Sequence, residues 1–122
     1  MTSKNLESKV LESGVCEILF NRAIDSIAVY DVQFDTEGKP VTCIVTHANQ
    51  SYLSFLQKPA EQVIDKNILD IIPGLSSTCI ERYANVLKTQ QQYHFEEYFP
   101  ALKKYVAVEV IPLHATGFAA IS

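Results

Sequence analysis

Apolar residues recur at helical spacing in the first part of the chain. Between residues 4 and 22 they appear every three or four positions, while charged side chains fall on the other side. This pattern predicts an amphipathic N-terminal helix over residues 1–22, followed by the main domain over residues 23–122. The apolar positions of the predicted helix are Leu6, Val10, Leu11, Val15, Ile18 and Leu19.

The pattern then changes to alternation or to continuous apolar runs, which are typical of strands. Two such runs, over residues 26–34 and 41–47, are joined by a polar stretch that contains glycine, and this predicts a β-hairpin. In the last third of the chain, residues 93–98, 105–113 and 117–121 predict three more strands. The connections between these strands are short, so we expect them to run antiparallel.

The middle of the chain is predicted to be helical. Residues 49–74 are interrupted by prolines, which favours short helices, and Asn49 can cap the first of them by accepting backbone amide hydrogens. A longer helix is expected over residues 76–89. The residues that share its apolar face are Cys79, Tyr83, Val86 and Leu87.

The order of these elements predicts an α+β fold with a five-stranded antiparallel sheet flanked by helices on one face. The space between sheet and helices is the usual site for a small ligand in such a domain. In the fourth strand we place Val106, Val108 and Val110 on the inner face. The alternate residues of that strand are half apolar, so we expect the N-terminal helix or a second subunit to cover the outer face. These alternate residues are Tyr105, Ala107, Glu109 and Ile111.

Composition and charge exclude several classes of protein. The 122 residues are 48% apolar and 20% charged, which is ordinary for one globular domain. The net charge of −4 disfavours nucleic acid as a direct partner. Cys16, Cys43 and Cys79 show no CxxC spacing, which predicts neither a disulfide framework nor a metal site and favours the cytoplasm. No apolar run has the length of a membrane span, so we expect no direct membrane insertion.

Several motifs, taken in order, resemble those of PAS domains. Asn49 at the end of the second strand resembles the asparagine that begins the family's first helix. Residues 64–73, IDKNILDIIP, are similar to its "G-K-N" segment, with Asp65 where glycine is usual. Residues 95–100, FEEYFP, resemble a strand ending common in bacterial PAS sensors. The resemblance spans residues 17–121. Asp65 would make a left-handed backbone costlier there, although aspartate tolerates that region better than most residues.

The resemblance implies a sensory and interaction module of a signal-transduction protein. Such a module binds a small ligand or dimerises and relays the signal to an output domain, for example a histidine kinase or a diguanylate cyclase. It catalyses no reaction. The expected partners are a second copy, held through the N-terminal helix and the outer sheet face, and a downstream effector domain. The sequence stops at Ser122, where the family usually continues into a linker, so we expect the output module to be absent or cut away.

The resemblance also bears on cofactors. Haem-binding members carry an axial histidine on the long helix, and residues 76–89 contain none. Flavin photosensors carry a reactive cysteine just after the asparagine of the "G-K-N" segment, whereas here Ile68 follows Asn67. We therefore expect neither haem nor a flavin adduct, and no metal, while a small organic ligand stays possible. A photosensor or haem sensor with unusual ligation is a third alternative.

The predicted ligand-binding residues come from the first strand, the long helix and the inner face of the late strands. For Tyr30, Cys79 and Tyr83, plain core packing is the alternative interpretation. The predicted set is Tyr30, Cys79, Tyr83, Phe95, Val106 and Val108.

A second class of function is a small α+β enzyme or a lipid-carrying domain with a buried acid or histidine. The strands could supply Glu97, Glu109, His47 and His114, and two of these would have to converge in a cleft. We expect His47 to lie at the surface. The chain contains no GxSxG, P-loop or HExxH motif, which weakens this interpretation.

The third predicted strand contains an acidic pair. Glu96 and Glu97 are adjacent, so their carboxylates point to opposite faces and cannot act together as acid and base. One of them must lie inward or pair with a cation. We predict Lys103 or Lys104, across the turn, as that partner. His94 is expected to be solvated.

Overall fold

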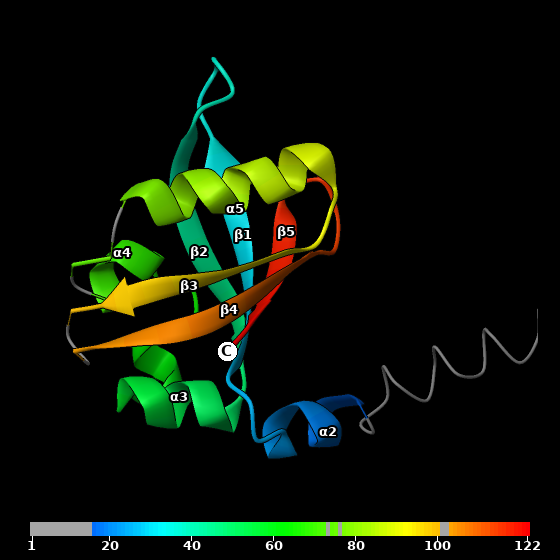
Figure 1. Ribbon diagram of the computed structural model, residues 1–122. Helices are drawn as coiled ribbons and strands as arrows, with labels where there is room; N and C mark the ends of the chain where they lie inside the picture. Colours follow the sequence, from blue (N-terminus) through cyan, green and yellow to red (C-terminus); the bar gives the residue numbers. More distant parts are fainter. Residues whose placement is uncertain (1–15, 73, 76, 101–102) are drawn as a thin grey trace, which may run out of the picture.

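The sheet has five strands, as the alternation predicts. The computed structural model describes residues 16–122 except 73, 76 and 101–102. Neighbouring strands in the order β2-β1-β5-β4-β3 all pair antiparallel (Figure 1). This confirms the α+β fold. The strands are β1 (Ile27–Phe34), β2 (Pro40–Ala48), β3 (Tyr93–Phe99), β4 (Lys104–Pro112) and β5 (Gly117–Ile121).

The helices of the middle segment contact the sheet. Figure 1 shows α5 lying across the strands, and contacts join α5 to β2, β4 and β5, α4 to β2, and α3 to β1. Residues 1–15 of the predicted N-terminal helix lie outside the described residues. The rest of the predicted helix coincides with α2. No helix within the described residues is long and apolar enough to cross a membrane. The helices are α2 (Cys16–Arg22), α3 (Gln50–Leu56), the 3-10 helix η2 (Ala60–Gln62), α4 (Ile68–Ile71) and α5 (Ser77–Thr89).

Asn49 caps α3, as predicted, and also ties the helix to the sheet. Its Oδ1 accepts hydrogen bonds from the backbone N–H of Tyr52 at 2.9 Å and of Ile27 at 3.0 Å. Its Nδ2 donates to the carbonyl of Asp25 at 2.9 Å. The side chain is fully buried, and these three bonds compensate for its loss of water. Asn49 therefore fixes the start of α3 against the start of β1.

Asp65 has the left-handed backbone that the motif comparison anticipates for this position, with φ of 68°. The backbone N–H of Asp65 donates to the carbonyl of Val45 at 2.8 Å, and the N–H of Val45 donates to the carbonyl of Lys66 at 3.0 Å. These bonds attach the segment before α4 to the edge of β2. Aspartate visits the left-handed region more readily than most residues, so the fold tolerates it here.

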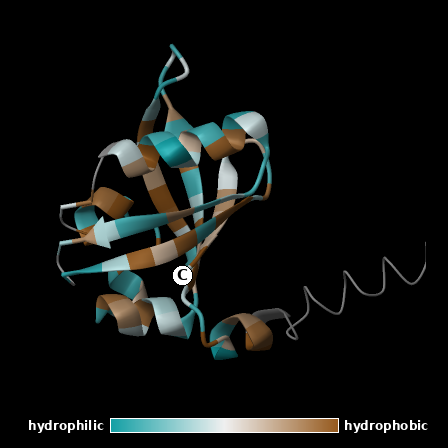
Figure 2. Ribbon diagram, in the orientation of Figure 1, coloured by the Kyte–Doolittle hydropathy of each residue, from teal (hydrophilic) through white to brown (hydrophobic). Residues whose placement is uncertain are grey.

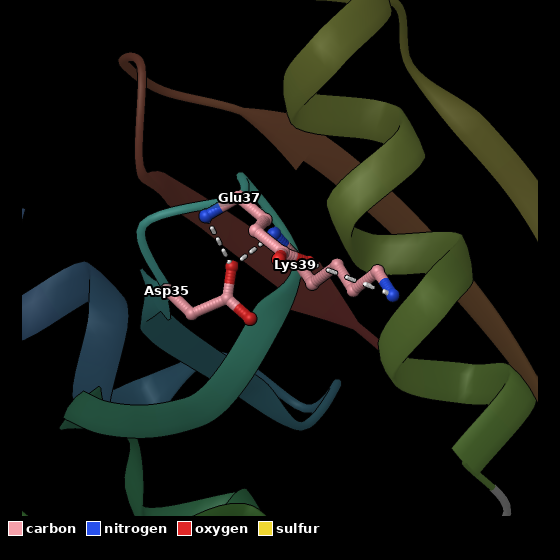
Figure 3. Close-up of polar contacts among 3 residues, drawn as sticks. All are labelled: Asp35, Glu37 and Lys39. Carbon is pink, nitrogen blue, oxygen red and sulfur yellow. Dashed lines mark hydrogen bonds and ion pairs between the residues drawn. The ribbon is translucent and has the colours of Figure 1, made fainter.

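The turn between β1 and β2 is held by the Asp35 carboxylate (Figure 3). Its Oδ1 accepts from the backbone N–H groups of Glu37 and Lys39, both at 2.9 Å. Gly38 has a φ of 80°, a left-handed backbone conformation that residues with a side chain rarely adopt. The ion pair between Lys39 and Glu37 spans 4.0 Å and is exposed, so it contributes little stability. The turn is fixed by the Asp35 bonds and by Gly38.

The two faces of the sheet divide as the alternation predicts. In β4, Val108 and Val110 are buried and Val106 packs against the core. Tyr105 and Ala107 on the other side are exposed. Each helix residue predicted to face inward is buried. These residues are Cys79, Tyr83, Val86 and Leu87.

Candidate functional site

Tyr30 lies at the centre of the inner face. It sits in β1 between the neighbouring strands β2 and β5, with Val45 and Phe118 opposite it. Its ring stacks on Phe118, with ring centroids 5.1 Å apart, and on Tyr83 of α5, at 6.0 Å. The rings of Tyr83 and Phe118 are themselves 4.5 Å apart. An aromatic cluster therefore joins the sheet to the long helix.

Two tyrosine hydroxyls meet inside this cluster. The Tyr30 and Tyr52 hydroxyl oxygens are 2.7 Å apart, and both side chains are buried. Burial is the main cause that raises the pKa of Tyr30, and the neighbouring Tyr52 adds to it. Burial also raises the pKa of Tyr52, against a smaller opposing effect of the Tyr30 hydrogen bond. Both hydroxyls are therefore neutral at physiological pH, and one donates to the other.

Two free thiols lie in the same core. Cys43 comes from β2 and Cys79 from α5, one turn before Tyr83, and both are fully buried. Burial raises the pKa of Cys79 to about 11, partly offset by a hydrogen bond with Tyr83. Burial, then the nearby Cys79, raises the pKa of Cys43 further above its usual value. Both thiols stay protonated at neutral pH and are poor nucleophiles.

The structure brings the six predicted ligand-facing residues together. Phe95 and Val108 are paired across β3 and β4, and the Phe95 ring lies 6.2 Å from that of Tyr83. Five of the six are buried in the same core cluster, and Val106 packs against its margin. Tyr83 connects three of them, because it contacts Tyr30, Phe95 and Cys79 within the packed core. The buried five are Tyr30, Cys79, Tyr83, Phe95 and Val108.

The sequence interpretation did not include Cys43, Tyr52 and Phe118 in the candidate site. Cys43 lies two residues before Val45 in β2, and Phe118 lies two residues before Ala120 in β5. Residues two apart in a strand share a face, so alternation could have placed both on the inner face. The backbone N–H of Tyr52 donates a hydrogen bond to Oδ1 of Asn49, the residue that caps α3. Its hydroxyl contact with Tyr30 joins residues 22 positions apart, and no local pattern signals it.

The predicted lysine partner of the acidic pair is wrong. Glu97 is buried and its Oε2 accepts from Nη1 of Arg82 on α5 at 2.8 Å. Lys104, opposite Phe99 at the start of β4, shares the inner face with Glu97, but its Nζ lies over the Phe55 ring, 5.9 Å from the ring centroid. The Arg82 guanidinium also lies 4.8 Å above the Phe95 ring. The ion pair and this cation–π contact connect the helix to β3.

The residues suggested for an enzyme or carrier do not converge. Glu97 is on the inner face and is paired with Arg82. Glu109 belongs to the opposite face, and His47 and His114 are exposed. Within the described residues, no group of three or more metal-ligating side chains lies together. The inner cluster thus offers neutral hydroxyls, thiols and aromatic rings.

A surface groove lies elsewhere, beside the exposed side of α5. Its volume is about 380 Å³, and the β1–β2 turn, α5 and the β4–β5 loop form its walls. None of the six predicted residues lines it. Its lining includes Phe34, Glu81, Ala84, Asn85, Lys88 and Ala115.

The fold is shared with sensor domains of known structure. No protein-family model and no curated protein matches the chain. A PAS domain of an HTR-like protein from Haloarcula marismortui superimposes with a TM-score of 0.58 at 21% identity, over 97% of this chain and 96% of that one. A sensory box sensor histidine kinase from Vibrio cholerae gives 0.61 at 17% identity, over 99% and 94%. The PAS domain of nitrogen regulation protein NR(II) from Vibrio parahaemolyticus gives 0.60 at 10% identity, over 88% and 94%. The chain is therefore a PAS-fold domain.

Proposed function

We propose that this chain is a sensory signalling module that acts through contacts between protein surfaces. It forms a homodimer through the outer face of the sheet and the N-terminal helix, and it passes a change of arrangement to an output domain. The observation that carries this proposal is the exposed, partly apolar outer face of the sheet. The similarity to a sensor histidine kinase supports the signalling role and the presence of an effector partner.

The outer face presents aromatic side chains to solvent. Tyr98 and Tyr105 form an edge-to-face pair with ring centroids 5.1 Å apart, and they are 42% and 70% exposed. Val29, Ile111 and Ile121 of the neighbouring strands are only half-buried. Tyrosines in such positions supply much of the binding energy at protein interfaces. A second copy would remove this apolar surface from water.

The helix α2 also exposes apolar side chains. Ile18 and Leu19 of α2 are 56% and 61% exposed. The Ser51 hydroxyl donates to the carbonyl of Ala23 at 2.6 Å and joins the end of α2 to α3. We include these α2 side chains in the proposed dimer contact, because a helix of this pattern gains stability when its apolar stripe is covered.

A route for relaying the signal follows from the strand pairing. Ser26 and Ser122 exchange two backbone hydrogen bonds, at 2.8 and 2.9 Å, beside the start of β1. A shift of the outer face therefore moves the segment after α2 and the end of β5 together. The stimulus must favour one arrangement of the sheet and its flanking helices over another, because equal affinity for both shifts no population.

Sedimentation velocity over a range of protein concentrations tests the dimer. We expect Tyr105→Glu to raise the dissociation constant at least about tenfold, because it places a charge in the buried contact. Tyr93→Glu is the matched control, since Tyr93 is an exposed tyrosine of β3 on the other side of the sheet. Equal effects of the two variants, or a wild-type chain that stays monomeric, would refute the outer-face dimer.

The inner cluster supports a second candidate, in which the module binds a small organic ligand. The observation that favours it is the presence of three tyrosine hydroxyls and two thiols among apolar side chains, where a ligand could find hydrogen-bond partners. The proposed contacts are Tyr30, Cys79, Tyr83, Phe95, Val106 and Val108.

Thermal unfolding in the presence of a panel of small aromatic and aliphatic metabolites tests this second candidate. A ligand of the inner cluster should raise the melting temperature of the wild type. The increase should be smaller in Cys79→Ala and unchanged in Tyr105→Ala, which alters only the outer face. If no compound raises the melting temperature, the ligand proposal fails while the dimer proposal stands.

A further inference from the structure

The exposed side of α5 carries charges with no partner in their own helix. Glu81 and Lys88 are exposed, and the helical neighbours between them, Ala84 and Asn85, carry no charge. At 1.5 Å of rise per residue, Glu81 and Lys88 lie about 10.5 Å apart along the helix, too far for a direct ion pair. Neither forms an ion pair with any other described residue. Figure 2 shows hydrophilic and hydrophobic stretches alternating along α5.

These positions form a self-complementary pattern. Glu81, Asn85 and Lys88 fall on one side of the helix, and the midpoint between Glu81 and Lys88 is the Ala84–Asn85 pair. If a second α5 lies antiparallel across that midpoint, each Glu81 faces the Lys88 of the other copy. A two-fold axis creates both ion pairs at once, as a closed symmetric contact requires.

The surface beside these charges is apolar and hollowed. Phe34, which is 38% exposed, lines the groove together with Ala84 and Ala115. The small Ala84 side chain at the centre would let the two helices approach closely. Burial of the Phe34 ring would supply favourable free energy, while the charges would fix the register.

We propose that the exposed side of α5 is a second homotypic interface, whose occupant is another copy of this chain with its α5 antiparallel. The occupant is argued from charge: the pattern of Glu81 and Lys88 complements itself under a two-fold rotation. This contact is separate from the outer sheet face, because it uses α5 and the β1–β2 turn. It does not depend on the dimer proposed above.

Charge reversal with mixing tests the proposal. Glu81→Lys alone puts like charges opposite one another at both ion pairs of a homodimer, and so does Lys88→Glu alone. Each variant should weaken this self-association about tenfold or more. An equimolar mixture of the two variants should associate as the wild type does, because every lysine then faces a glutamate. The chain carrying both reversals should also associate normally.

Charge changes elsewhere on the surface test whether the effect is specific to α5. Glu61→Lys and Lys66→Glu make the same charge changes at exposed positions away from α5 and should leave association unchanged. Circular dichroism verifies that each variant is folded. Native mass spectrometry of the mixed variants, distinguished by isotope labelling, should find mixed dimers above their statistical share. A statistical mixture, no effect of either single reversal, or no self-association of the wild type beyond the outer-face dimer would overturn the proposal.

Discussion

The two faces of the sheet carry similar residues in contrasting environments. On the inner face, Tyr30 and Tyr83 are buried and stacked within the core. On the outer face, Tyr98 and Tyr105 also contact each other, yet both remain exposed. Residue type is therefore a poor guide to role in this chain, because tyrosine serves both the core and the surface.

The difference separates stability from recognition. Inner-face side chains pack against three helices, so their removal leaves a cavity in dense surroundings. Outer-face side chains can change with little cost to folding and remain available to a partner. A substitution on the inner face therefore reports on stability, and one on the outer face reports on recognition.

Truncation of the central aromatic residue should give the largest effect. We expect Tyr30→Ala to lower the free energy of unfolding by about 3–5 kcal/mol, because the cavity would lie among packed rings. Tyr105→Ala should change it by no more than about 0.5 kcal/mol. Urea unfolding followed by circular dichroism measures both. Similar losses for the two variants would show that the faces do not differ as described.

Removal of the cation that pairs with Glu97 should rank second. Arg82→Met leaves a buried carboxylate without its partner and should cost about 2 kcal/mol. Lys104→Met is the matched control and should cost no more than about 1 kcal/mol, since Lys104 is exposed and its Nζ lies over the Phe55 ring at 5.9 Å from the centroid. Urea unfolding compares the two variants. A larger loss of stability for Lys104→Met than for Arg82→Met would contradict the assignment of Arg82 as the partner of Glu97.

Alkaline pH should destabilise the fold through the inner face. The folded-state pKa values of Cys43, Cys79, Tyr30, Tyr52 and Tyr83 are raised, so the unfolded state loses these protons first. Stability should therefore be unaffected by these groups below about pH 9 and should fall above it. Each such proton contributes about 1.4 kcal/mol per pH unit.

Urea unfolding between pH 8 and pH 11 measures this dependence. Cys79→Ala should make the decline shallower, whereas Tyr105→Phe should leave it unchanged, because that residue is exposed. A free energy of unfolding that does not change over this range would contradict the assigned burial of the thiols and hydroxyls.

Loss of a single hydroxyl should give the smallest effect. Tyr52→Phe removes one partner of the 2.7 Å contact and should cost about 1 kcal/mol. Tyr98→Phe, on the outer face, should be neutral within experimental error. Thermal unfolding of the two variants compares them. If Tyr52→Phe is also neutral, the hydroxyl contact between Tyr30 and Tyr52 does not stabilise the fold.

The strands and the face of each residue could be predicted because they follow local rules. Alternation placed Val108 and Val110 inward, and the cap at Asn49 marked the start of α3. The partner of Glu97 could not be found in this way. Arg82 precedes it by fifteen positions and belongs to another element, so the distance between them depends on how α5 crosses the sheet.

The candidate site was predictable in its residue types and only partly in its contacts. Strand parity and the helical face identified Tyr30, Cys79 and Tyr83 as inward-facing. The hydroxyl contact of Tyr30 with Tyr52, and the stacking of Tyr30 on Phe118, depend on the meeting of elements distant in sequence. Packing of this kind follows from tertiary structure and leaves no periodic signal.

One NMR titration tests most directly the claim that the outer face recognises a second copy while the inner face forms a packed core. Spectra of the labelled protein are recorded during serial dilution. We predict concentration-dependent shifts at Val29, Ile121 and Tyr105, with constant shifts at Tyr30, Val108 and Val110. Shifts that change mainly at the inner-face residues, or at none of the six, would contradict the account.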